Sequence, residues 1–193
     1  MTIARMLRTA IGLFLMLTLI TGVVYPVAMT LLAQAIFPFQ ANGSVLMRED
    51  QPQGSLLLGQ AFTGERYFRG RPSMAAPEPY DAMGGVGSNL AATNPALLAR
   101  IEERVKALRS DASAGASAVP VDLVTCSASG LDPHISPAAA LYQVPRVARL
   151  RGLPVEKLRG IVMEHVEPPV FGVLGQARVN VMRLNLDLDA AKR

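Results

Sequence analysis

The chain has 193 residues, of which half are hydrophobic, and this length allows one ordinary domain with an appendage. Its formal charge is +4, but Arg5 and Arg8, which precede the first apolar run, contribute two of these charges. The remaining 17 basic and 15 acidic residues nearly balance, which excludes a broad nucleic-acid surface. The single cysteine, Cys126, excludes an internal disulfide framework and a multi-cysteine metal site, and we interpret it as a small buried hydrophobe.

The N-terminal region predicts a transmembrane helix. No charged residue occurs between Arg8 and Arg48, whereas a bilayer core about 30 Å thick requires roughly 20 apolar helical residues. Because basic residues precede this run and the residues directly after it are uncharged, we expect a cytoplasmic N-terminus at 1–8, a transmembrane region at 9–37 and an extracytoplasmic soluble domain at 38–193.

A cleaved signal peptide is the alternative, since Ala33–Ala35 has the small-x-small form of a cleavage site. The apolar core of a signal peptide is usually about 7–15 residues, so we favour a retained anchor. Pro26 predicts a kink in the helix. Thr18, Thr21 and Gly22 are small residues that favour a partner helix at this face, with lipid as the alternative.

The soluble region predicts a mixture of strands and helices. Gly54–Phe62 has a strand-like apolar run, and a long loop rich in Pro, Gly and Asn follows at 74–94. Asn94-Pro95 predicts a capped helix start, followed by one apolar face. That face consists of Leu97, Ile101, Val105 and Leu108.

The second half of the soluble region continues this mixture. We expect a flexible linker at 110–118, a strand beginning in 119–129, helices at 138–152 and 154–166 with a kink at Pro145, and a closing strand at 178–189. The second helix has Val155, Leu158, Val162 and Val166 on one face. Since no βαβ period repeats, the predicted fold class is α+β, one N-terminal transmembrane helix followed by one mixed extracytoplasmic domain.

Motifs for ATP hydrolysis are missing from the sequence. The glycine-rich stretch Gly84–Leu90 lacks the Lys-Ser/Thr of a P-loop and the spacing of a dinucleotide fingerprint, so a turn is the better interpretation. The Asp-Lys-Thr-Gly sequence of P-type ATPases is missing too. We therefore assign no catalytic residue and no metal ligand. The two histidines, His134 and His165, are only weak evidence for a metal site.

The stretch GLDPHISP combines residue types of a hydrolase with those of a helix start. His134 with Ser129 or Ser136 would supply a base and a nucleophile, with Asp132 to orient them, but no nucleophile elbow is present. A rigid helix-start loop that serves as a docking surface is the favoured interpretation. This candidate docking loop is Gly130, Leu131, Asp132, Pro133, His134, Ile135 and Ser136.

A second candidate surface follows the stretch ERYFRGRPS, which interleaves arginines with aromatic residues. Such a mixture can stack on bases, bind acidic headgroups or form a protein interface, since Arg and Tyr are enriched at hot spots. The candidate interface is Tyr67, Phe68, Arg69, Arg71, Ser88 and Asn89.

One motif suggests a DNA-binding protein. The segment 146–162 resembles a helix-turn-helix, with Ala148, Gly152 and Val155 near the usual small and apolar positions. The expected topology argues against a membrane-anchored regulator, because these helices would lie outside the cell, away from DNA.

Taken in order, the motifs resemble the C subunit of the Kdp potassium-transporting ATPase. The resemblance covers nearly the whole chain and is specific because many stretches match in one order. They are LTLITGVVYPVAMTLLAQAIFPFQANGS, GQAFTGERYFRGRPS, GSNLAATNP, VPVDLVTCSASGLDPHISPAAA, QVPRVARLRGL and RVNVMRLNLDLD. Cys126, where the family pattern suggests alanine, leaves the resemblance intact.

The resemblance implies a non-hydrolytic accessory subunit of an ATP-driven, high-affinity potassium import complex in the cell inner membrane. The implied partners are a channel-like potassium-binding subunit, a P-type ATPase subunit, a small membrane peptide and membrane lipid, with no nucleic acid. The family role is described as assembly and as a catalytic chaperone that raises ATP affinity in the ATPase subunit. No firmly bound cofactor is implied: potassium is the transported ion, and ATP enters through the ATPase subunit. A membrane-anchored extracytoplasmic hydrolase using His134 is the alternative.

Overall fold

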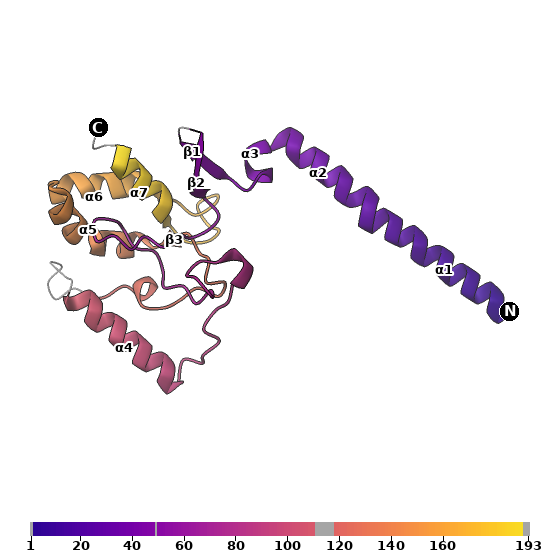
Figure 1. Ribbon diagram of the computed structural model, residues 1–193, viewed down its shortest axis with the longest axis horizontal. Helices are drawn as coiled ribbons and strands as arrows, with labels where there is room; N and C mark the ends of the chain where they lie inside the picture. Colours follow the sequence, from indigo (N-terminus) through magenta and orange to yellow (C-terminus); the bar gives the residue numbers. More distant parts are fainter. Residues whose placement is uncertain (1, 49, 111–117, 191–193) are drawn as a thin grey trace. The chain divides into compact units, whose positions relative to one another are not determined.

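The computed structural model describes residues 2–48, 50–110 and 118–190. The chain divides into two compact units, with the boundary between Val45 and Leu46. The first unit is dominated by one apolar helix that runs from Ile3 to Ile36 (Figure 1). It is 34 residues long and contains an 18-residue stretch with a mean hydropathy of 2.1, none of which is buried, so the helix is long and apolar enough to cross a membrane.

Pro26 is accommodated without ending this helix. The helix consists of α1 (Ile3–Leu19), a π-helical turn η1 (Ile20–Val24) and α2 (Tyr25–Ile36), and the short α3 (Pro38–Ala41) follows. The π turn ends at Val24, two residues before the proline, and the predicted kink stays a prediction. Single π turns inside α-helices are one of the known causes of helix bending.

The second unit contains the remaining elements, and its mixture of helices and short strands confirms the predicted α+β class. In chain order they are β1 (Val45–Arg48), β2 (Gln51–Ser55), the 3-10 turn η2 (Ala82–Gly84), α4 (Pro95–Ser110), the 3-10 turn η3 (Val121–Leu123), β3 (His134–Ile135), α5 (Pro137–Arg151), α6 (Val155–Glu164), β4 (Val166–Glu167), β5 (Arg178–Asn180) and α7 (Val181–Ala190).

The core of this unit lies between α5, α6 and α7, which are grouped at one end of it in Figure 1. An antiparallel sheet of order β3-β5-β4 adjoins the helices and pairs His134 with Asn180 and Val166 with Val179. α4 lies below the helix group in Figure 1, and its Leu108 packs against the core. The fully buried aliphatic side chains of the core include Ile135, Val144, Val147, Leu158, Val162, Val179, Leu184 and Leu188.

The three predicted helices are confirmed, two of them with their caps, but α6 ends at Glu164, so Val166 lies on β4 and not on the predicted helix face. The Asn94 side chain accepts a hydrogen bond from the Ala96 N–H at 2.9 Å at the start of α4, and Ser136 Oγ accepts one from the Ala139 N–H at 3.2 Å at the start of α5. α5 continues through Pro145 to Arg151. Its C-cap Gly152 has a φ of +67°, a conformation that glycine adopts without strain.

The predicted closing strand is wrong beyond Asn180, because α7 begins at Val181. Leucines at alternate positions include pairs four residues apart, so the same sequence also presents one helical face. The buried side chains of that face are Val181, Leu184, Asn185 and Leu188.

Two other strand predictions are wrong. The segment 119–129 contains the 3-10 turn η3 and no strand, and the strand predicted in Gly54–Phe62 ends at Ser55, followed by a turn. Both stretches are short apolar runs, for which periodicity alone does not separate a strand from a buried loop. The predicted linker falls mostly on residues outside the described ranges.

Candidate functional site

The segment Glu65–Gly70 begins in a turn and is held along its backbone by side chains of α5 and α7. Asn185, fully buried on α7, accepts a hydrogen bond from the Phe68 N–H and donates one to the Phe68 carbonyl, both at 2.9 Å. Gln143 on α5 binds the Arg69 N–H at 2.8 Å and the Arg69 carbonyl at 3.0 Å in the same way. Two side-chain amides thus replace the neighbouring strands that would otherwise satisfy this backbone.

Two arginines of α5 complete the clamp. Arg146 donates to the carbonyls of Glu65 and Tyr67, and Arg151 donates to the Arg66 carbonyl at 2.8 Å. The Arg151 guanidinium also lies 5.0 Å from the centre of the Tyr67 ring and 2.8 Å from Asp189. These four side chains of α5 and α7, Gln143, Arg146, Arg151 and Asn185, are called the backbone clamp below.

The structure separates the six residues of the candidate interface. The Phe68 side chain is completely buried and therefore belongs to the core rather than to the surface. Tyr67 is half-buried and its hydroxyl donates to Asp189 at 3.0 Å. Arg69 and Ser88 are also half-buried, whereas Asn89 is exposed. Arg71 is directed into the candidate docking loop.

The candidate docking loop is held by contacts from several segments. Gly130 has a φ of +70°, and a Cβ there would lie 2.6 Å from the Val86 carbonyl oxygen, so only glycine fits. Ser73 Oγ donates to the Gly130 carbonyl at 2.7 Å, and the Gly59 N–H donates to the Leu131 carbonyl at 2.8 Å. The loop is therefore rigid.

Asp132 is the polar centre of the docking loop. Its carboxylate accepts a hydrogen bond from the His134 N–H at 3.0 Å, lies 3.5 Å from the His134 ring and pairs with Arg71 at 3.4 Å. Beside it is a hollow of about 300 Å³, whose lining includes Asp122 and Arg178. Pro133 and Ile135 of the loop are buried, so their side chains do not reach the surface.

The seryl hydroxyls near His134 are engaged elsewhere. Ser129 Oγ accepts from the Leu131 N–H at 3.2 Å, and Ser136 Oγ caps α5. Among the described residues, no hydrogen bond joins the His134 ring to either hydroxyl, which is the contact that a nucleophile and its base require. No group of three or more His, Cys, Asp or Glu residues in the described ranges is placed to hold a metal ion.

Two ionisable groups in and near the docking loop, Asp132 and Tyr80, have shifted pKa values. Burial raises the pKa of Tyr80 to about 12; the Asp132 carboxylate adds to this increase and Arg71 opposes it. Burial alone would also raise the pKa of the Asp132 carboxyl. Hydrogen bonds from the His134 side chain and backbone, together with the charge of Arg71, nevertheless hold the pKa of Asp132 below its usual value.

The lowered pKa of Asp132 predicts an acid-sensitive loop. Because the folded state depresses this pKa, the carboxylate contributes stability that is complete above the unfolded value near pH 4 and is lost as the pH falls through the folded value. We expect the melting temperature of the wild-type chain to fall more steeply between about pH 5 and pH 3 than that of Asp132→Asn, followed by circular dichroism. Parallel pH profiles would contradict this assignment.

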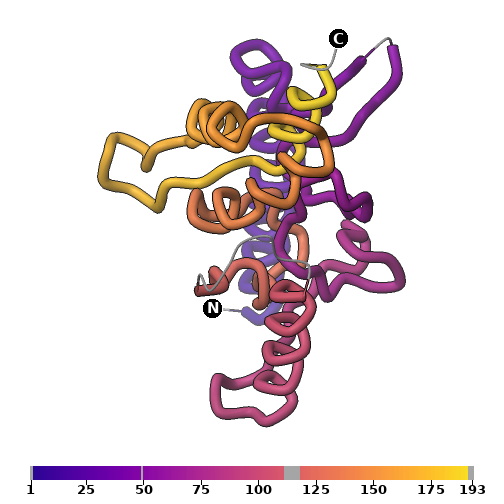
Figure 2. Tube along the Cα trace, turned by 90° about the vertical axis from the view of Figure 1, so that its left-hand side faces the viewer, coloured from indigo at the N-terminus to yellow at the C-terminus, as the bar shows by residue number. Residues whose placement is uncertain are grey.

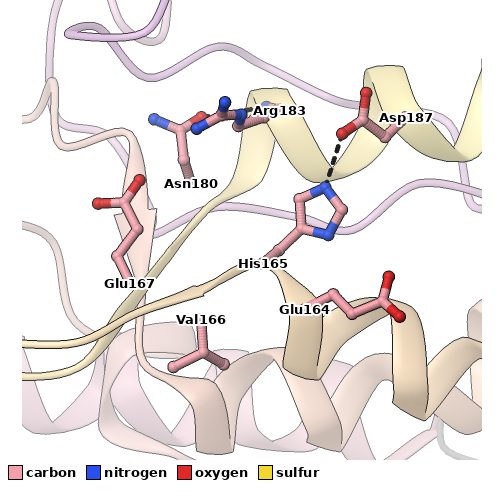
Figure 3. Close-up of a pocket in the computed structure, with 7 residues that line it drawn as sticks. All are labelled: Glu164, His165, Val166, Glu167, Asn180, Arg183 and Asp187. Atoms are coloured by element: carbon pink, nitrogen blue, oxygen red, sulfur yellow. Dashed lines mark hydrogen bonds and ion pairs between the residues drawn. The ribbon is translucent and has the colours of Figure 1, made fainter.

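A second polar hollow lies where α6 ends. His165 caps the helix and its ring nitrogens lie 2.8 Å from the Ile161 carbonyl and 2.7 Å from the Asp187 carboxylate of α7. Figure 3 shows the ring directed at Asp187, with Glu164 and Glu167 at the edge of the hollow. His165 therefore joins α6 to α7, a tertiary role that its position near a helix end did not reveal.

The link between β4 and β5 is an apolar tip that sequence reasoning missed. It spans 168–177, contains no charged residue and projects from the side of the domain (Figure 2). The Val170 and Leu174 backbones exchange two hydrogen bonds of 2.9 Å, so the tip has a defined shape. Its large hydrophobic side chains are exposed: Val170 51%, Phe171 89%, Val173 79% and Leu174 61%.

The comparison with known families accounts for nearly the whole chain. Residues 7–190 match the family model KdpC, described as K+-transporting ATPase, c chain. The chain belongs to the KdpC family. The resemblance of the ordered motifs is thereby confirmed.

Individual KdpC relatives match over almost their full lengths. The potassium-transporting ATPase KdpC subunit of Polaromonas naphthalenivorans is 57% identical over 188 residues, which cover 97% of this chain and 96% of that protein. The KdpC subunit of Methylococcus capsulatus is 54% identical, with 96% and 97% covered. That of Variovorax paradoxus is 52% identical, with 97% of both covered.

Proposed function

We propose that this chain is a non-hydrolytic accessory subunit of an ATP-driven potassium import complex and that it holds the complex together. Membership of the KdpC family and the names of its relatives, subunits of a potassium-transporting ATPase, support this role. The proposed partners are a channel-like potassium-binding subunit, a P-type ATPase subunit and a small membrane peptide. Potassium is the transported ion.

The observation that carries the assembly role is the apolar tip at 168–177. The polar side chains of the docking loop and of the backbone clamp are engaged within the domain, as Asp132 is by Arg71 and Asn185 by the Phe68 backbone. The tip, by contrast, exposes four large hydrophobic side chains together. Soluble domains keep contiguous apolar patches small unless the patch meets a partner. Because the tip is uncharged, the surface that receives it on a partner subunit is apolar as well.

Replacing two tip residues tests this role. We expect the double variant Phe171→Ser, Val173→Ser to shorten the half-life of the detergent-solubilised complex by at least about tenfold, because burial of two such side chains is lost. Retained partner subunits would be quantified over time on an affinity column. Met163→Ser removes a 54% exposed apolar side chain from α6 and is the control. Unchanged retention of the double variant would contradict the proposal.

The proposed location is the cell inner membrane, with the N-terminus in the cytoplasm and the second unit outside. The apolar helix Ile3–Ile36 and Arg5 and Arg8 near its start support this orientation. A thiol at the 95% exposed Met83, introduced as Met83→Cys together with Cys126→Ser, reports on it. Labelling by a membrane-impermeant maleimide in cells with a permeabilised outer membrane is expected. Labelling only after the inner membrane is opened would contradict it.

An effect on ATP affinity fits this orientation only as an indirect coupling. An outer domain does not touch a cytoplasmic nucleotide, so any increase in the ATP affinity of the ATPase subunit would pass through the apolar helix or the neighbouring subunits. Such a coupling is a free energy between two conformational states of the complex. ATP titrations of the complex with and without this subunit test it, and equal affinities would exclude it.

A further inference from the structure

The middle of the apolar helix contains two backbone carbonyls without their usual donor. In the π turn η1, the Tyr25 N–H donates to the Ile20 carbonyl, five residues back. The next residue is Pro26, which has no N–H. Neither the Thr21 carbonyl, five residues before it, nor the Gly22 carbonyl, four residues before it, can therefore accept a hydrogen bond from position 26.

Side chains of the helix do not replace the missing donor. Thr21 Oγ1 donates to the Leu17 carbonyl at 2.7 Å, and Thr30 Oγ1 donates to the Pro26 carbonyl at 2.8 Å. Among the side-chain hydrogen bonds of the described residues, none reaches the carbonyl of Thr21 or of Gly22. Threonine hydroxyls often compensate for a proline in a membrane helix, but here they bind other carbonyls.

The surface beside these carbonyls is open. Gly22 has no side chain, and a Cβ built on it would have the Thr18 methyl carbon, at 4.0 Å, as its nearest contact. The position is about 4 Å from the midpoint of the helix Ile3–Ile36 at 1.5 Å per residue. The hydrocarbon core of a bilayer offers no water at this depth, so leaving a carbonyl without a donor on a lipid-facing surface is costly, whereas a neighbouring helix can supply the donor.

We propose that the notch formed by the Thr21 and Gly22 carbonyls binds a hydrogen-bond donor side chain, a hydroxyl or an amide, from a membrane helix of a partner subunit. The inference rests on the proposed function, because it assumes that the helix spans the membrane within the complex. The partner chemistry follows from the carbonyls, which accept and cannot donate. The absence of a side chain on Gly22 lets the partner backbone approach closely enough for a short donor.

Pro26→Ala is the decisive variant. It restores an N–H that binds one of the carbonyls within the helix, adds no bulk and favours the helix itself. We expect it to shorten the half-life of the purified complex roughly fivefold, the size of one interhelical hydrogen bond. Gly22→Leu places a side chain over the notch and is also expected to shorten the half-life of the complex. Gly12→Leu is the control, since nothing lies within 4 Å of a Cβ at that glycine of the same helix.

The possible results separate the explanations. Wild-type half-lives for Pro26→Ala would overturn the inference, and a loss confined to Gly22→Leu would mean close packing without the hydrogen bond. A photo-crosslinking residue at position 21 is expected to capture a partner subunit; capture of lipid or of a second copy alone would overturn the inference too. If the wild-type chain itself retains no partner subunit, the proposed function fails instead.

Discussion

Replacing Asn185 with alanine is expected to lower the free energy of unfolding by about 3–5 kcal/mol. The substitution leaves the buried N–H and carbonyl of Phe68 without partners, and each unsatisfied group costs about 1–3 kcal/mol. The loss of the fully buried side chain adds a cavity. Thermal or denaturant unfolding of the full chain in detergent, followed by circular dichroism, measures the change.

A leucine at the same position separates hydrogen bonding from packing. Asn185→Leu retains the volume but neither hydrogen bond, so we expect nearly the same loss of stability as for alanine. The exposed amide variant Gln53→Ala is the control and is expected to change stability by less than about 0.5 kcal/mol. Wild-type stability of Asn185→Leu would show that the hydrogen bonds of Asn185 to the Phe68 backbone do not stabilise the fold.

The second large effect is expected at Phe68, whose side chain is completely buried. Phe68→Ala should lower the free energy of unfolding by about 3–5 kcal/mol, as large-to-small changes in a core do. The same change at the 89% exposed Phe171 should cost less than about 0.5 kcal/mol. A Phe68→Ala variant with wild-type stability but poor retention of partner subunits would instead make Phe68 an interface residue.

Local signals explain which elements the sequence predicted well. The caps Asn94 and Ser136 act on residues two or three positions away, so their helices are encoded in short stretches. The strands β3, β4 and β5 have only two or three residues each and depend on pairing between distant segments. Of these three strands the period-2 pattern indicated only β5, and it misassigned α7, because leucines four residues apart fit both a strand and a helix.

The same distinction applies to the candidate site. The docking loop has local signals in its glycine, proline and capping serine, but the contacts that hold it, from Gly59, Ser73 and Arg71, come from distant segments and were not predicted. The backbone clamp joins Phe68 to Asn185, 117 positions apart, and no local pattern indicates that a buried asparagine on α7 satisfies that backbone. The apolar tip did have a local signal: ten uncharged residues that include Val170, Phe171, Val173 and Leu174 between two predicted elements.

The most direct test of the account is affinity purification of the tagged chain from mildly solubilised membranes of potassium-starved cells, with ATPase activity assayed on the eluate. We predict that larger membrane subunits elute with it and that the eluate hydrolyses ATP in a potassium-stimulated manner. Recovery of the chain alone, without ATPase activity in several gentle detergents, would contradict its role as a subunit of the potassium import complex.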